Sequence, residues 1–219
     1  NTNMKGTLKD LFTPSLRRTT ICILIIVSLT NLMISGTSVT STLTLKALSN
    51  QKKLTNYDVI ISQLVIAIPP IPANFGSLVS ETKTFGRIKT LLMIQGVSMI
   101  AMEVACLFTR FFDTAYGVSI GFMFLITSMS NSYTCEVYPT KIRSVAMGLI
   151  TSIGRGCGGI SQFLFLFLFD FGHFIPYYVS LGFMSIVIIA TFLLPYETHN
   201  QPLDKDYNQN TEKETDENV

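Results

Sequence analysis

Long apolar stretches with almost no charge alternate with short polar segments along the chain. An α-helix rises about 1.5 Å per residue, so about 20 residues cross a hydrocarbon core about 30 Å thick. A membrane strand needs only about 10 residues with strict alternation, which these stretches do not show. We therefore predict an all-α membrane protein with six transmembrane helices, over residues 19–45, 59–80, 90–109, 114–135, 144–169 and 174–196.

The two ends of the chain are polar and lie outside this six-helix pattern. Residues 1–18 form a lead-in, and "LRRTT" (16–20) marks its border with the first span. Residues 197–219 form an acidic tail without apolar periodicity, which is typical of disorder. An even number of spans places both ends on one side of the membrane. That side carries most of the basic residues, and basic residues gather on the cytoplasmic face, so both termini are predicted to be cytoplasmic. The eleven basic residues on that side are Lys5, Lys9, Arg17, Arg18, Lys83, Arg87, Lys89, Lys141, Arg143, Lys205 and Lys213, against Lys46, Lys52, Lys53 and Arg110 on the other.

The composition excludes several other classes of protein. Only 14% of the residues are charged and 48% are hydrophobic, whereas a soluble domain carries about 25% charged residues. The net charge of +2 and the lack of a basic run argue against a nucleic-acid partner. The four cysteines have no zinc or redox spacing, and no cluster of His, Cys or acidic residues shares a face. We expect no enzyme activity, metal or cofactor, and the lipid bilayer as the main partner.

Polar side chains concentrate in the second half of the first predicted span. Asn31, Ser35, Thr37 and Ser38 are among them, and they cover more than one face of a helix. Some would hydrogen-bond a solute from a water-filled cavity, and others would pack against neighbouring helices, where small residues allow close approach.

The second predicted span contains the proline-rich string "IPPIPANFG". Pro69, Pro70 and Pro72 remove backbone donors and are expected to bend or break the helix. Transporters use broken helices around their cavities, but a static kink explains the same string.

Two charged residues lie inside predicted spans. Glu103 is either a functional carboxylate, and then a candidate for proton coupling, or a carboxylate near the outer boundary that reaches water. Arg155 follows Arg143 by twelve residues, about 18 Å along a helix, which places it near the bilayer midplane. There it is expected to face the bundle interior, near a partner or a watery cavity.

Glycines surround this arginine in "SIGRGCGGI", residues 152–160. Gly154 and Gly158 form a small-xxx-small pair that favours close helix packing, and Gly156 and Gly159 are expected to widen the same smooth face.

The loops between the spans carry a family resemblance. "FGRIKT" (85–90), "EVYPTKIR" (136–143) and "LPYETHNQPL" (194–203) resemble the loops of the C-terminal six-helix half of a major facilitator superfamily transporter. The organic-ion transporters and the related synaptic-vesicle-protein and sugar-porter branches are the most similar. The resemblance implies alternating access in a plasma or organelle membrane, with a missing N-terminal half or a second six-helix chain to enclose the solute cavity.

The resemblance also implies gating residues in these loops. Glu136 and Arg143 would form an ion pair that holds one conformation and breaks in the other. Gly86 and Arg87 match the Gly-Arg loop, in which the family usually has an aspartate three residues before the glycine. Lys83 occupies that place here and Glu81 lies nearby, shifted in register.

Arg155 gains a role from the same resemblance. The twelfth residue after the arginine of the Tyr-Pro-Thr string is commonly aspartate in organic-cation transporters and arginine in organic-anion transporters. The resemblance thus implies secondary transport of a small organic anion. The substrate-binding candidates are Arg155, Asn31, Ser35, Thr37 and Ser38. The alternatives are a non-transporting receptor or structural subunit on the same fold, or an inactive fragment, with Arg155 paired to carbonyls or to a partner's acid.

Overall fold

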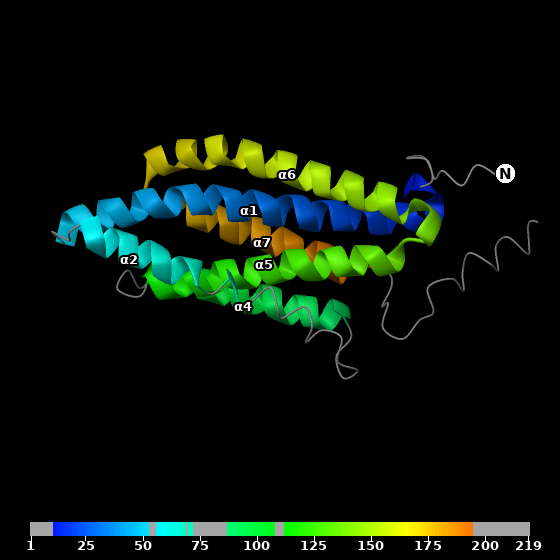
Figure 1. Cartoon of the computed structure of the whole chain (residues 1–219), viewed down its shortest axis with the longest axis horizontal. Helices are drawn as coiled ribbons and strands as arrows, with labels where there is room; N and C mark the ends of the chain where they lie inside the picture. Colours follow the sequence, from blue (N-terminus) through cyan, green and yellow to red (C-terminus); the bar gives the residue numbers. More distant parts are fainter. Residues whose placement is uncertain (1–10, 53–55, 69, 72–86, 108–111, 195–219) are drawn as a thin grey trace, which may run out of the picture.

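The computed structural model describes residues 11–52, 56–68, 70–71, 87–107 and 112–194. Within these ranges the chain is helical and forms no strand, which confirms the predicted all-α class. The helices run side by side along the long axis of the molecule (Figure 1). They are α1 (Pro14–Lys52), α2 (Asn56–Ala67), α4 (Arg87–Leu107), α5 (Phe112–Val137), α6 (Thr140–Phe171) and α7 (Ile175–Phe192).

Four helical segments in the described ranges are long and apolar enough to cross a membrane, and α4 contributes a shorter apolar segment, Thr90–Met102. The four are Leu16–Ala47, Phe112–Val137, Thr140–Phe171 and Ile175–Phe192. They coincide with four of the six predicted spans.

The second predicted span is interrupted where its prolines begin. Helix α2 ends at Ala67, the chain bends at Ile68, and Pro70 and Ile71 are again helical. The break follows from the missing proline donors and from the bias of residues that precede proline away from helix. Pro69, Pro72 and the rest of the span lie outside the described residues, so the crossing of this span stays a prediction.

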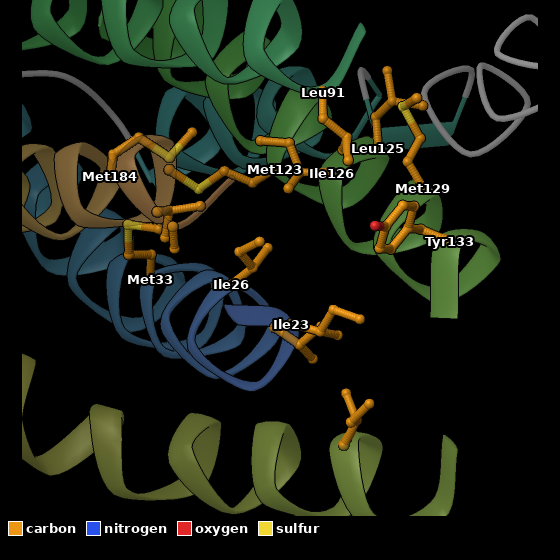
Figure 2. Packing of buried hydrophobic residues seen from close by; sticks show 14 of the residues in the cluster. Ile23, Ile26, Met33, Leu91, Met123, Leu125, Ile126, Met129, Tyr133 and Met184 are labelled. Atoms are coloured by element: carbon orange, nitrogen blue, oxygen red, sulfur yellow. The ribbon is translucent and has the colours of Figure 1, made fainter. Parts of the chain in front are cut away.

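Helix α1 is the centre of the bundle. It packs against α6 on one side and against α7 and α5 on the other, while α4 lies against α5 and α7 (Figure 1). Figure 2 shows Ile26 and Met33 of α1 pointing towards Met123 of α5 and Met184 of α7. All four are buried. Flexible methionine side chains fill the gaps between helices that cross without a regular repeat.

Paired polar side chains join the buried faces of α4, α5 and α7. Gln95 of α4 donates from Nε2 to Oγ1 of Thr191 in α7 over 2.8 Å. Ser98 of α4 and Ser119 of α5 donate to each other's backbone carbonyls over 3.2 and 3.0 Å. Between apolar helices such bonds replace water and fix which faces meet.

Aromatic rings close one end of the bundle, which we call the Tyr177 end and define by Thr44, Phe112, Tyr116, Phe174 and Tyr177. Phe112 and Tyr116 stack with ring centroids 5.5 Å apart, and Tyr177 meets both rings edge-on. The Tyr177 hydroxyl donates to Thr44 Oγ1 over 3.1 Å. This cluster ties together the end of α1 and the starts of α5 and α7.

The opposite end, the Tyr138 end, is defined by Leu11, Thr20, Tyr138 and Arg143. Tyr138 lies between α5 and α6, is buried, and donates its hydroxyl to Thr20 Oγ1 over 2.7 Å. Thr20 Oγ1 in turn lies within donating distance of the carbonyls of Leu11 and Leu16, at 3.0 and 2.9 Å. Burial raises the pKa of the Tyr138 phenol, and the bond to Thr20 opposes that rise. The loop between α5 and α6 is thus fastened to the start of α1.

Candidate functional site

Close packing of α1 on α6 depends on glycines. A Cβ atom on Gly154 would lie 2.9 Å from Cγ1 of Val27, and one on Gly158 would lie 2.8 Å from Oγ of Ser35. On the facing helix, a Cβ atom on Gly36 would lie 2.5 Å from the ring of Phe165. Side chains at these positions would force the helices apart, so the predicted small-xxx-small contact is confirmed.

The same contact corrects the expectation for the other two glycines. A Cβ atom on Gly156 or Gly159 would meet nothing within 4 Å, and both residues are exposed. They follow Gly154 by two and five residues, which turns them about 200° and 140° around the helix, away from α1. The prediction that they widen the packing face was wrong.

A groove of about 680 Å³ runs beside this contact, between α1 and α6. Its α1 wall carries Ser35, Ser38 and Thr42, which the spacing of 3, 4 and 7 residues puts on one face of the helix. Its α6 wall carries Gln162 and Leu166. The other lining residues are apolar and belong to α1: Ile34, Val39 and Leu43. The groove therefore offers both hydrogen-bonding and apolar surface.

The structure separates the polar residues of the first predicted span. Ser35 and Ser38 lie together in the groove. Thr37 is fully buried on another face and donates from Oγ1 to the carbonyl of Met33 over 2.7 Å, so it lies in the core and not in the groove. Asn31 is half-buried at the contact with Gly154 and donates from Nδ2 to the carbonyl of Val27 over 2.8 Å.

Arg155 lies on the open side of α6, and not in the interior of the bundle as the sequence led us to expect. The positions that face α1 are taken by Gly154, Gly158 and Ser161, all of which are buried. Gln162 follows Arg155 by seven residues, which is two helical turns on the same face and a rise of about 10 Å. Arg155 thus lies on the same face of α6 as the groove residue Gln162, and it is not one of the lining residues of the groove.

The exposed surface of α6 has two chemically different faces. Of the four candidate spans this one is the least covered, with 22% of its apolar window buried against 56% in α5. In the middle of the helix, between Leu149 and Phe169, its polar exposed positions are Ser152, Arg155 and Gln162. Its apolar exposed positions, which lie farther round the helix, include Ile153, Ile160, Leu164, Phe167 and Phe171. The apolar face suits lipid, whereas a membrane-embedded arginine requires water or protein.

The predicted gating residues are only partly within the described structure. Arg143 donates from Nε to the carbonyl of Tyr138 over 3.3 Å, and its Nη2 is buried with no hydrogen-bond partner among the described residues. Glu136 is half-buried in the last turn of α5. An ion pair between Glu136 and Arg143 stays a prediction.

The structure does not describe the side chains of the remaining predicted residues. Gly86 and Glu81 are outside the described residues. Arg87 is the first residue of α4 and Glu103 lies within α4, but the side chains of both are outside the described structure. Their proposed roles in gating and in proton coupling stay predictions.

Sequence reasoning missed the apolar lining of the groove and two of its polar residues, Thr42 and Gln162. Gln162 was detectable, because a carboxamide two turns after Arg155 on an otherwise apolar helix marks the same face. Thr42 had no such signal, since serines and threonines occur on every face of α1.

The all-helical fold agrees with the similarities to known proteins. The family model described as "Sugar (and other) transporter" matches residues 101–208. Solute carrier family 22 member 16 of Bos taurus is 33% identical over 140 residues, which are 64% of this chain and 22% of that protein. Solute carrier family 22 member 27 of Mus musculus is 29% identical over 204 residues, 91% of this chain and 34% of that protein. SVOPL of Danio rerio is 36% identical over 74 residues, 34% of this chain and 15% of that protein.

The chain spans about a third or less of the length of these curated relatives. The matched regions, the all-helical bundle and the apolar spans are consistent with one another. They support a relation of the chain to the major facilitator superfamily transporters, including the organic-ion and SVOPL-like branches, and the described helices agree with an all-α half of that fold.

Proposed function

We propose that this chain forms one half of a secondary transporter that moves a small organic anion by alternating access. The observation that carries the proposal is Arg155, an exposed arginine in the middle of a membrane-length helix, on the face of α6 that also holds groove residue Gln162. The relatives named as solute carriers support the general activity.

The charge of Arg155 favours an anionic solute. Arginine stays protonated at any physiological pH, and its planar guanidinium can hold a carboxylate through two hydrogen bonds. A fixed positive charge at membrane depth is costly unless it meets water, a partner acid or a ligand anion. It repels organic cations by the same Coulomb interaction.

The open polar face of α6 supports a second six-helix unit as the opposite wall. In relatives about three times as long as this chain, further sequence is available for that wall. We propose that an N-terminal half or a second six-helix chain covers the α1–α6 groove, and that rocking of the two units exposes it to each side of the membrane in turn.

The Tyr138 end supplies the parts for a gate in this proposal. Glu136 and Arg143 lie on either side of the turn that Tyr138 fastens to α1, so an ion pair between them would oppose movement of α6 relative to α5. Gly86, Arg87 and Glu81 would form the second gate, Glu103 would couple transport to protons, and both termini would be cytoplasmic.

Uptake of labelled anions and cations into proteoliposomes that contain this chain together with the unit that forms the opposite wall tests this function. We expect saturable uptake of octanoate or benzoate, no uptake of tetraethylammonium, and a loss of about tenfold to a hundredfold in anion kcat/KM for Arg155→Gln. Lys141→Gln is the matched control, because it removes an exposed charge at the start of the same helix, and it should change kcat/KM less than twofold.

Two outcomes would decide against the proposal. Uptake of tetraethylammonium that is unchanged in Arg155→Asp would rule out anion selection. Solute binding without any uptake, in liposomes where the reconstituted protein is intact, would instead indicate a non-transporting receptor on this fold.

A further inference from the structure

Gln162 carries a carboxamide that the described fold does not use. Two other glutamines in the described helices bind threonine hydroxyls: Gln63 donates to Thr42 over 3.3 Å, and Gln95 donates to Thr191 over 2.8 Å. Gln162 is exposed, lines the groove and has no hydrogen-bond partner among the described residues. An amide at membrane depth is unfavourable unless water or a ligand satisfies it.

Ser35 is the matching group on the opposite wall of the groove. The neighbouring α1 hydroxyls are committed: Thr37 and Ser38, for example, donate to the carbonyls of Met33 and Ile34. Ser35 has no hydrogen-bond partner within the described part of the chain, and its Oγ lies over the bare backbone of Gly158. Ser35 and Gln162 both line the groove, and Gln162 is one helical turn, about 6 Å, beyond the glycine that Ser35 contacts.

The third element is the spacing between Gln162 and Arg155. The two residues share one face of α6 with Gly159 between them, and two turns, about 10 Å, separate their Cα atoms. The groove around Gln162 mixes apolar side chains, Ile34, Val39, Leu43 and Leu166, with the hydroxyls of Ser35, Ser38 and Thr42. This region therefore offers a cation on one side and, two turns away, a groove with apolar surface and neutral hydrogen-bonding groups.

We propose that Gln162, assisted by Ser35, is a specificity-determining residue that binds a neutral polar group of the solute, a hydroxyl or a carbonyl, about two helical turns from the carboxylate held by Arg155. The inference rests on the proposed anion transport and narrows its substrate class to elongated amphipathic anions with a second polar group at the far end. The carboxamide of Gln162 both donates and accepts, so it recognises a hydroxyl in either orientation.

A pair of acids that differ in one hydroxyl tests this role: octanoate and 8-hydroxyoctanoate. Their affinities are measured by isothermal titration calorimetry on the purified protein in nanodiscs, and their kcat/KM values by uptake into proteoliposomes. We expect the wild type to favour the hydroxy acid by about threefold to tenfold, the effect of one net hydrogen bond. Gln162→Leu should remove this preference while octanoate binding stays within twofold, and Ser35→Ala should reduce the preference in part.

Matched variants separate this inference from the proposed function. Ser152→Leu adds an apolar side chain to the same exposed side of α6, away from the groove, and should leave the preference intact. Equal affinity of the wild type for the two acids, or a preference that survives in Gln162→Leu, would overturn the role of Gln162 while Arg155→Gln still weakens both acids. Binding of neither acid by the wild type would overturn the anion proposal and this inference with it.

Discussion

The two faces of α1 use the same residue types in different ways. On the core face, Thr30 and Thr37 are fully buried, and each donates to a carbonyl of its own helix over 2.7 Å. On the groove face, Ser35 and Ser38 line an open groove, although Ser38 also donates to the carbonyl of Ile34. We infer that a hydroxyl in a membrane helix indicates a binding site only when the neighbouring helices leave its face uncovered.

Glycine produces that uncovered face. Gly154 and Gly158 bring the backbone of α6 against Val27 and Ser35, and the groove opens beside this close contact. The core face is instead filled by methionines and by the rings of the Tyr177 end. Substitutions on the two faces should therefore affect stability and binding to different extents.

Tyr177→Ala should have the largest effect, because it breaks the core face. It removes a fully buried ring that contacts Phe112 and Tyr116 and also the hydroxyl that binds Thr44. We expect a loss of about 3–5 kcal/mol in the free energy of unfolding, measured by denaturant titration in detergent micelles. Tyr178→Ala is the control, since Tyr178 is 51% exposed and should cost less than about 1 kcal/mol. Similar losses in the two variants would contradict the cluster.

Gly36→Ala should come next, because it forces a methyl group into the ring of Phe165. We expect a loss of about 1–3 kcal/mol from overpacking, and recovery of at least half of it in the double variant Gly36→Ala with Phe165→Leu. Gly156→Ala, where a Cβ atom meets nothing within 4 Å, should be neutral or stabilising because alanine favours helix. An unchanged melting temperature in Gly36→Ala would show that α1 and α6 are not in close contact.

Tyr138→Phe should have a smaller effect that depends on pH. Loss of the bond to Thr20 should cost about 0.5–1.5 kcal/mol at pH 7. Burial raises the folded-state pKa of Tyr138 above the ordinary value near 10, so its contribution to stability is present below about pH 10 and is lost as pH rises through the folded pKa. Unfolding free energies measured between pH 8 and pH 11 should fall less steeply for Tyr138→Phe than for the wild type. Parallel curves for the two proteins would contradict the shift.

Ser38→Ala and Thr37→Val should have the smallest effects on stability. Together they test most directly which of the two residues faces the groove. Ser38 is exposed in the groove, so its loss should change stability by less than about 0.5 kcal/mol but weaken octanoate binding about twofold to threefold. Thr37 lies in the core, so Thr37→Val should leave that affinity unchanged. Titration calorimetry on the two variants measures both effects, and a larger loss of affinity in Thr37→Val would reverse the assignment of the faces.

The sequence was sufficient to predict the all-helical class, four of the spans and the close packing of Gly154 and Gly158 on a neighbouring helix, but not that α1 is this neighbour. Apolar length determines a membrane helix almost alone, and the four-residue spacing of Gly154 and Gly158 puts both on one face. The orientation of individual polar residues was not predictable in the same way. Ser35, Thr37 and Ser38 lie within one turn of helix, and only the positions of α5 and α6 decide which of them is buried.

Arg155 is a second polar residue whose orientation was not predictable from the sequence. Its depth near the midplane stays a prediction from the twelve-residue distance to Arg143, and the direction in which it faces depends on which helix covers α6. Because α1 covers α6 from one side and takes the glycine face, Arg155 lies on the open side. Gly156 and Gly159 were misassigned for the same reason, since a glycine can be required for packing or can simply be exposed.

The isolated carboxamide of Gln162 has a consequence for how this protein can diversify. Within the described structure, no other side chain depends on Gln162 for a hydrogen bond, whereas Gly154 and Gly158 cannot grow without displacing α1. A change of residue at Gln162 can therefore alter what the groove accepts at little cost to folding. Related chains could acquire a different solute selectivity through changes at this position while the glycine contact between α1 and α6 stays fixed. The selectivity of the groove can therefore change in evolution without a change in the fold.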